Sequence, residues 1–260
     1  MEPGITTLTE DKFSTMQVDI LAIGVHPDDV ELSCAGTLIN EIKAGKKVAI
    51  LDLTEGELGT RGTAQTRYQE AAQAAIIMGV HARENLKMRD GFFKNDETHQ
   101  LQLIQAIRKY RPSVVFANAL QDRHPDHGRA GQLIAESCFL SGLQKIETSD
   151  EQGQLQQKWR PAYVFHYIQD RFHEPHFIVD ITAVFEQRMQ AIRAYTTQFH
   201  NPQDQSNEPQ TYISSKNFLA AIEARARLLG KRIGVDYAEG FTSVKNIGIK
   251  SIDSLVLHET

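Results

Sequence analysis

Apolar and polar positions alternate along the chain in blocks that predict strands and helices in turn. Residues 19–25 and 47–53 are near-continuous apolar runs, which are typical of strands buried on both faces of a parallel sheet. Each run precedes a segment with helical apolar spacing, at about residues 30–44 and 65–78. A polar loop at 54–63 contains three glycines. The first quarter of the chain therefore reads as strand, helix, strand, helix.

The same alternation continues to about residue 140 and is less regular afterwards. We predict further strands at about 86–88, 113–118, 161–168 and 177–181, and helices at about 99–110, from 127 to 140, at 182–199 and at 214–230. The polar segments 142–157 and 201–210 predict surface loops. Strands and helices in this order, with short connections, predict an α/β fold with a parallel, doubly wound sheet. No linker or repeat divides the chain, so we expect a single domain over residues 1–260.

Composition narrows the classes of protein without pointing to one. The 260 residues include 28 Lys and Arg against 33 Asp and Glu, a net charge of −5, which argues against a broad nucleic-acid surface. Two cysteines are too few for a disulfide scaffold or a cysteine-rich zinc module. The first residues have neither the basic start nor the apolar core of a secretory signal, and no run approaches the ~18 apolar residues of a membrane span. We therefore expect a cytoplasmic protein with no membrane or nucleic-acid partner.

Two predicted strands end in unusually polar sequences. Residues 26–29 read His-Pro-Asp-Asp after the first strand, and residues 124–127 read His-Pro-Asp-His after the strand at 113–118. In open α/β sheets, ligands bind beyond the carboxyl ends of the strands. Either motif alone could be turn chemistry or a helix cap. Two such motifs at two strand ends favour a functional site.

The residue types at these positions are those that bind zinc. A catalytic zinc takes three protein ligands from His and Asp side chains and leaves one position open. His26 and Asp29 lie three apart across a strand-to-helix turn, and His127 would come from the neighbouring loop. Asp28 cannot easily point the same way as Asp29, so it could act as a general base toward water. We expect one zinc ion per chain.

The motifs of several other enzyme classes are absent from the sequence. No Gly-x-Gly-x-x-Gly follows the first strand, so dinucleotide binding is not expected. There is also no P-loop, no Gly-x-Ser-x-Gly elbow and no His-Glu-x-x-His. Cys34 and Cys138 fall in helical patterns and are interpreted as packing residues.

Together, these motifs resemble those of the PIG-L/LmbE-like zinc deacetylases. The first block is Val-His-Pro-Asp-Asp-Val-Glu at 25–31 followed by Gly-Thr, and the third is His-Pro-Asp-His at 124–127. The second block spans 53–62 with Arg67 and Glu70 after it, and Tyr-Ala-Glu-Gly-Phe at 237–241 resembles a C-terminal block. The second block looks most like the branch of bacillithiol biosynthesis, which removes acetate from N-acetylglucosaminyl-malate. The resemblance covers residues 19–241, nearly the whole chain.

The resemblance implies a Rossmann-like three-layer α/β/α fold with a mostly parallel sheet, and a role for each matching residue. His26, Asp29 and His127 match the zinc ligands, and Asp28 matches the catalytic base. His124 matches a histidine that stabilises the tetrahedral intermediate as an imidazolium, with Asp126 as its orienting carboxylate. Arg67 matches a substrate-binding arginine, and Tyr212 is placed as a second substrate contact. Members near this branch form homo-oligomers, commonly hexamers.

The lead hypothesis is zinc-dependent removal of the N-acetyl group from a small-molecule N-acetylglucosaminide, with N-acetylglucosaminyl-L-malate of bacillithiol biosynthesis as the expected substrate. Alternatives inside the family are a chitooligosaccharide deacetylase and a thiol-conjugate amidase. Outside it stand a two-metal phosphoesterase, for which the chain offers too few spare ligands, and a sugar-binding module without activity. A malyl aglycone would need a cationic partner, and we name Arg61, Arg129 and Arg171 as candidates without ranking them.

Overall fold

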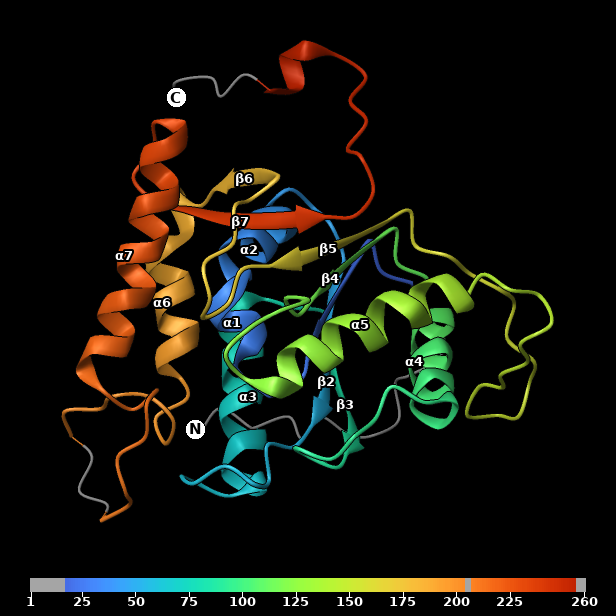
Figure 1. Ribbon diagram of the computed structural model, residues 1–260, viewed down its shortest axis with the longest axis horizontal. Coiled ribbons are helices and arrows are strands. Elements are labelled where there is room, and N and C mark those ends of the chain that lie inside the picture. The colour runs from blue at the N-terminus through green and yellow to red at the C-terminus, as the bar shows by residue number, and fades with distance from the viewer. Residues whose placement is uncertain (1–16, 204–206, 256–260) are drawn as a thin grey trace, which may run out of the picture.

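A single seven-stranded sheet forms the centre of the fold (Figure 1). The computed structural model describes residues 17–203 and 207–255. The strands are β1 (Ile20–Gly24), β2 (Val48–Thr54), β3 (Ala82–Met88), β4 (Val114–Ala117), β5 (Tyr163–Tyr167), β6 (Phe177–Asp180) and β7 (Ala238–Ser243). β1 and β2 are buried along their whole length, as their unbroken apolar runs predict.

The strand order places the two polar motifs side by side. The order is β3-β2-β1-β4-β5-β7-β6, with parallel pairing from β3 through β5. β7 lies antiparallel to both β5 and β6, so the sheet is mostly parallel, as predicted. The order reverses direction between β1 and β4, which pair directly. Such a switch point opens a crevice at the carboxyl ends of the two strands, and both motifs begin there.

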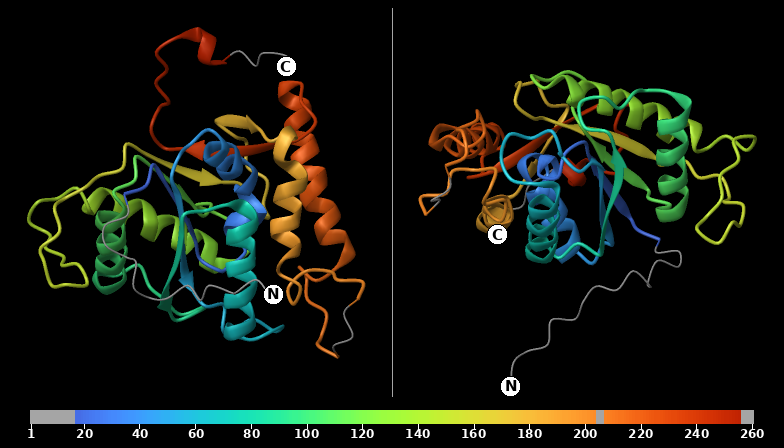
Figure 2. Two further views of the ribbon diagram at one scale, coloured as in Figure 1. Left: turned by 180° about the vertical axis from the view of Figure 1, so that it is seen from behind. Right: turned by 90° about the horizontal axis from the view of Figure 1, so that it is seen from below.

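Helices cover both faces of the sheet and complete three layers. They are α1 (Asp29–Ser33), α2 (Ala35–Lys43), α3 (Ala64–Met78), α4 (Glu97–Tyr110), α5 (Pro125–Leu140), α6 (Phe185–Arg193) and α7 (Lys216–Ile233), with short 3₁₀ turns η1 (Thr182–Val184) and η2 (Ile252–Leu255). Viewed from below, α4 and α5 lie on one side of the sheet and α1, α2, α3 and α6 on the other (Figure 2). The three-layer α/β/α fold predicted from the sequence is confirmed.

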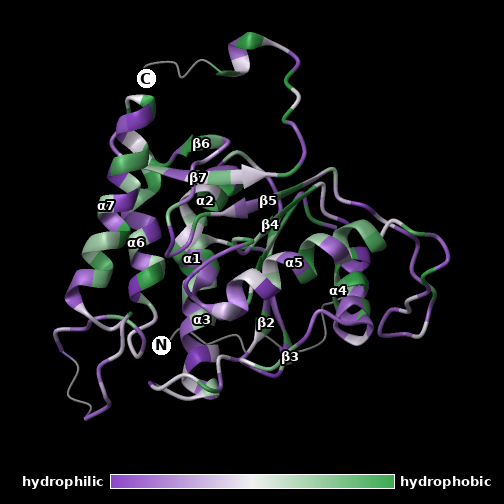
Figure 3. Ribbon diagram, in the orientation of Figure 1, coloured by the Kyte–Doolittle hydropathy of each residue, from purple (hydrophilic) through white to green (hydrophobic). Residues whose placement is uncertain are grey.

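Alternate residues of the central strands supply two apolar cores. Leu21 and Ile23 of β1 point toward α4 and α5, whereas Ile20 and Ala22 point toward α2, α3 and α6. Figure 3 shows the central strands mostly apolar and the helices with distinct polar and apolar faces. Both free cysteines are buried, consistent with their predicted packing role. Within the described ranges, no helix combines the length and hydropathy that crossing a bilayer would take.

The helix predicted at 30–44 is two helices with a break at Cys34, whose φ is −146°. A carboxylate from a distant part of the chain binds at the start of the second helix. Glu239 of β7 accepts hydrogen bonds from the main-chain N–H groups of Gly36 and Thr37, at 3.0 and 2.8 Å. These are free donors at the start of α2, and an anion there is favoured by the helix dipole. The break therefore depends on a long-range contact, and it separates the short α1 from α2.

Candidate metal centre and active site

The first motif follows β1 in a sharp turn, and hydrogen bonds from several strand ends hold its Asp29 carboxylate. One Asp29 oxygen accepts hydrogen bonds from the main-chain N–H groups of Val25 and His26 and from the Asn118 side chain, each at 3.0 Å. The other oxygen accepts from Gln169 at 3.1 Å. Each of these donors comes from β1, β4 or β5, or from the residues that follow their carboxyl ends. They hold the Asp29 carboxylate in one orientation.

Asp28 adopts a backbone conformation that is rare for a residue with a side chain. Its φ is 133° and its ψ −22°, although it is neither glycine nor asparagine. Such conformations cost about 1–3 kcal/mol and concentrate at functional sites. The Asp28 and Asp29 carboxylates contact different groups. The Asp28 carboxylate lies on the cavity wall, 3.6 Å from Arg67 Nη1.

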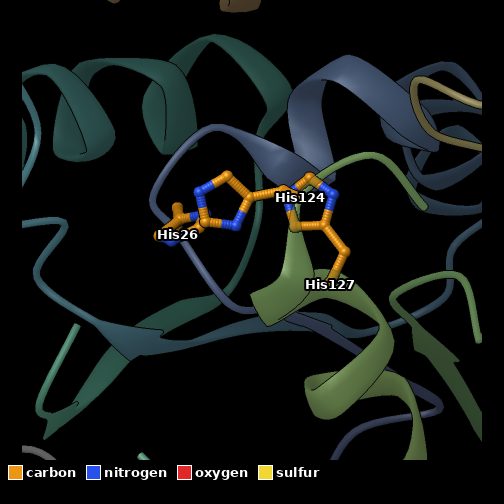
Figure 4. Close-up of side chains that lie close together, drawn as sticks. All are labelled: His26, His124 and His127. Carbon is orange, nitrogen blue, oxygen red and sulfur yellow. The ribbon is translucent and has the colours of Figure 1, made fainter. Parts of the chain in front are cut away.

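The second motif starts α5 and places two histidines beside the first. The ring centroids of His26 and His124 are 4.9 Å apart, and those of His26 and His127 are 5.7 Å apart. Figure 4 shows the three imidazoles gathered from the two turns. The donor atoms of His26, His124 and His127 can all lie within 4.8 Å of one another, and a second such group is His26, Asp90 and Asp126. The structure thus brings together residues that are about one hundred positions apart.

Two of the histidines face Asp29 through one ring nitrogen each. His127 Nε2 is 3.2 Å from one Asp29 oxygen, and His26 Nδ1 is 3.8 Å from the other. The opposite ring nitrogens contact Asp122 and Asp90, at 2.6 and 3.0 Å. Metal-binding histidines almost always have such an acceptor on the ring nitrogen that does not bind the metal. The donor set of the predicted zinc triad therefore fits a divalent cation.

The electrostatics of the site also favour positive charge at this place. Burial alone would lower the pKa of His26, but its hydrogen bonds to Asp126 and Asp90 raise it to about 10. Burial also opposes protonation of His127, yet the charge of Asp29 raises its pKa to about 9. Burial lowers the pKa of His124, and the neighbouring His26 and His127 add to this. A bound divalent cation would take the place of the protons on His26 and His127, since a metal ligand must be deprotonated.

The pKa values of Asp28 and Asp29 are shifted in opposite directions although the two residues are neighbours. Burial raises the pKa of Asp28 to about 7, against the opposing charge of Arg67. Burial would raise the pKa of Asp29 too, but the charge of His127 outweighs it and the net pKa is lowered. Neighbouring carboxylates whose environments push their pKa values apart are suited to different roles. Asp29 stays an anion, and Asp28 can exchange a proton near neutral pH.

The glycine-rich loop at 54–63, whose role the sequence left open, surrounds the Arg67 guanidinium. A Cβ atom on Gly56 would lie 3.0 Å from Arg67 Nη1, and one on Gly59 would lie 3.2 Å from Nη2. Gly56 also has a φ of 63°, which suits glycine. Arg67 donates to the main-chain oxygen of Pro27 at 3.3 Å and to the Gln198 side chain, and its Nε has no partner among the described residues. Arg67 is thus buried beside Asp28 and lies on the cavity wall.

The remaining predicted residues divide between the cavity and its support. Tyr212 is exposed at the cavity wall, and its hydroxyl donates to Asp170 at 2.9 Å. Asp126 is buried, and its carboxylate accepts from Arg129 at 2.8 Å and from the main-chain N–H of Gly91 at 3.0 Å. The main-chain N–H of Asp126, not its carboxylate, donates to His124 Nδ1 at 3.3 Å.

Sequence reasoning missed several residues that hold the site together. Asp90, Asn118 and Gln169 each follow closely on the carboxyl end of a parallel strand, β3, β4 or β5. The strand-end rule that found the two motifs would also have found these three. Asp122 carried no signal of its own, because its importance depends on the 2.6 Å contact with His127.

All of these groups line or support one cavity of about 430 Å³. Its walls include Arg67, Tyr212, Arg123 and Arg225 together with the motif residues. Cavities of this order accept small ligands and bury most of their surface.

Comparison with known proteins identifies the family. The model of the family described as GlcNAc-PI de-N-acetylase (PIG-L) matches residues 21–138. A diacetylchitobiose deacetylase of Thermococcus kodakarensis is 30% identical over 238 residues, which cover 88% of this chain and 84% of that protein. The chain belongs to the PIG-L family. As a PIG-L (LmbE-like) deacetylase, it is a hydrolytic enzyme of the N-deacetylase class.

Two other PIG-L relatives bear on the fold and on the predicted branch. The conserved protein TT1542 from Thermus thermophilus, which has a crystal structure, is 36% identical in sequence to this chain. The two structures superpose with a TM-score of 0.79 over 90% of this chain and 97% of that one. A probable N-acetyl-alpha-D-glucosaminyl L-malate deacetylase 2 of Bacillus anthracis is 21% identical over 193 residues, 69% of this chain and 81% of that protein. The family resemblance is confirmed. The relatives include a diacetylchitobiose deacetylase and a probable N-acetyl-alpha-D-glucosaminyl L-malate deacetylase, so each candidate substrate has a matching relative.

Proposed function

We propose that this protein hydrolyses the N-acetyl group of a small N-acetylglucosaminide in a zinc-dependent reaction. One observation carries the proposal. One ring nitrogen of His26 contacts Asp90 and one of His127 contacts Asp122, while the other nitrogen of each ring faces Asp29. These groups lie at the edge of a cavity that Asp28 also lines. A metal site beside a second carboxylate of raised pKa is the arrangement that hydrolysis of an amide needs.

His26, Asp29 and His127 would hold one zinc ion per chain. When bound, zinc would supply Lewis-acid polarisation of the amide carbonyl and a lowered pKa for the attacking water. Asp28 takes the proton of that water and passes it to the leaving amine, so that acetate and a free amine are released. The pKa of Asp28, raised by burial to about 7, suits a group that must first accept and then donate.

Two cationic or donor groups complete the site. Arg67, buried and 3.6 Å from the Asp28 carboxylate, binds the substrate beside the reacting carbonyl. His124 accepts a hydrogen bond at Nδ1, so the proton of its neutral imidazole lies on Nε2. From the cavity wall, this N–H donates to the oxygen on which negative charge develops. Asp126 supports His124 through its main chain, and Tyr212 contacts the part of the substrate farther from the reacting bond.

Of the three arginines expected to hold an anionic aglycone, two already have partners and the third lies outside the cavity lining. Arg61 donates to the main-chain oxygens of Thr197 and Glu208, and Arg129 donates to Asp126. Arg171 does not line the cavity. A neutral aglycone needs none of these arginines, and a diacetylchitobiose deacetylase matches 88% of the chain at 30% identity. We therefore favour a neutral N-acetylglucosaminide such as diacetylchitobiose over N-acetylglucosaminyl-malate, the second candidate, which the Bacillus anthracis relative supports.

A panel of substrates tests this function. The zinc-loaded protein is incubated with diacetylchitobiose, N-acetylglucosaminyl-malate and free N-acetylglucosamine, and acetate is measured. We expect diacetylchitobiose to have the highest kcat/KM. A preference for the malyl conjugate that weakens with salt would reverse our order of the two candidates. No acetate from any of the three would refute the proposed function.

We also propose the domain organisation, the assembly and the cellular location of this protein. The chain would form a single domain over residues 1–260, assemble as a homo-oligomer, commonly a hexamer in this family, and act in the cytoplasm on a soluble substrate. Light scattering of the purified protein measures the assembly directly. A mass of six chains would support a hexamer, and a mass of one chain would contradict assembly.

A further inference from the structure

Asp122 contacts a predicted metal ligand although it is not itself a predicted ligand. Its carboxylate lies 2.6 Å from His127 Nδ1, and its side chain is entirely buried. Its other oxygen accepts the main-chain N–H of Arg171 at 2.7 Å. Both oxygens are therefore engaged, and the carboxylate cannot rotate without losing a bond.

Asp90 makes the corresponding contact on the other side of the site. One of its oxygens lies 3.0 Å from His26 Nε2, nearer than the Asp126 carboxylate at 3.7 Å, and the other accepts the main-chain N–H of Leu58 at 3.2 Å. The main-chain N–H of Asp90 donates to Glu57 at 2.8 Å. Asp90 thus connects His26 to the glycine-rich loop that surrounds Arg67.

These contacts decide which nitrogen of each ring is available. A neutral imidazole carries one N–H, and where carboxylates face both ring nitrogens the nearer one draws that proton: Asp122 at 2.6 Å for His127 and Asp90 at 3.0 Å for His26. His127 is then left with a lone pair on Nε2, and His26 with a lone pair on Nδ1. Those two nitrogens are the ones that face Asp29, at 3.2 and 3.8 Å.

We propose that Asp122 and Asp90 are positioning residues that select opposite ring nitrogens, Nε2 of His127 and Nδ1 of His26, for the metal. This inference rests on the metal site of the proposed function. It goes beyond that function because it assigns the tautomer of each ligand to a named carboxylate, and it predicts that metal affinity depends on residues that never touch the metal.

Zinc affinity of the metal-free protein, measured by competition with a chromophoric chelator, tests the proposal without using activity. Asp122→Asn keeps the shape of the side chain but loses its charge, so we expect zinc binding about 10–100-fold weaker. Asp90→Asn should weaken zinc binding by a similar order. The matched control is Asp96→Asn, because Asp96 makes the same 2.6 Å contact to Nδ1 of His99 on α4. The control should bind zinc as the wild type does.

A double-mutant cycle separates positioning from general support of the fold. If Asp122 acts through His127, then Asp122→Asn should have no further effect on zinc affinity in a His127→Ala background. An equal loss in both backgrounds, or wild-type affinity in Asp122→Asn and Asp90→Asn, would overturn the proposal. If Asp122→Asn does not fold, as judged by circular dichroism, the same comparison is made with Asp90→Asn and His26→Ala.

The outcome is distinguishable from failure of the proposed function. A wild-type protein that binds zinc tightly, shows the losses described above and releases no acetate would leave the positioning roles standing and refute the deacetylase reaction. A protein that releases acetate with unchanged zinc affinity in both variants would do the reverse.

Discussion

The two turns begin with the same three residues, His-Pro-Asp, but the aspartate has a different environment in each. Asp28, in the first turn, lies on the cavity wall beside Arg67 and has a φ of 133°. Asp126, in the second turn, is 1% exposed, bonds to Arg129 and Gly91, and lies 3.7 Å from His26 Nε2. The first and fourth residues of the two turns, in contrast, lie close together: the rings of His26 and His124 are 4.9 Å apart, and His127 Nε2 is 3.2 Å from Asp29.

The difference originates in how each turn enters its helix. The second turn begins a sixteen-residue helix with Pro125 in its first turn and His124 at the N-cap with a φ of −79°. That is an unstrained helix start, and it carries Asp126 into the helix and away from the cavity. The first turn begins a five-residue helix with a strained residue and no side-chain cap. The comparison teaches that the strained turn carries the reactive carboxylate and that the relaxed turn supports the ligands.

The largest predicted effect is a contrast between the two third-position aspartates. Asp28→Asn cannot accept a proton, so kcat should fall by about 10²–10⁴-fold while zinc stays bound. Asp126→Asn should keep much more activity, because its carboxylate is not at the reacting atoms. Acetate release and zinc content are measured for both variants. Equal losses in the two would remove the distinction between the turns.

The next effect separates two possible metal-binding histidines. His127→Ala should lower zinc content sharply, whereas His124→Ala should retain zinc and lose turnover. The reason is that His127 has Asp122 on one ring nitrogen and Asp29 on the other, and His124 accepts a main-chain hydrogen bond instead. Elemental analysis gives the metal content. Loss of zinc from His124→Ala with retention in His127→Ala would replace one ligand by the other.

The smallest effect is on stability and has the opposite sign to the effect on activity. Asp28→Gly relieves a strain of about 1–3 kcal/mol, against about 0.5–1 kcal/mol of extra unfolded-state entropy for glycine. The free energy of unfolding should rise by about 1 kcal/mol while activity is lost. Asp126→Gly, in an unstrained helix, should destabilise the protein. Denaturant unfolding of the two variants decides whether the first turn is strained for function, and destabilisation by Asp28→Gly would argue that it is not.

Sequence patterns predicted the parts of this molecule that depend on local chemistry. The apolar runs of β1 and β2 and the strand-end rule located both motifs, and the Asp28 and Asp29 carboxylates contact different groups in the structure. β7 was missed because Glu239 and Gly240 interrupt its apolar pattern, and the break at Cys34 depends on that same Glu239. The contact of Asp126 with Arg129 rather than with His124 was also out of reach of the sequence, since it follows from the rotation of α5.

The central claim is that the residues around Asp29 hold a zinc ion that activates an N-deacetylase. The most direct test is to remove metal with a chelator and then titrate zinc while measuring acetate release from diacetylchitobiose. We predict no release from the metal-free protein and a linear rise that ends at one zinc per chain. Full release without metal, or none at any zinc level with any N-acetylglucosaminide, would contradict the account.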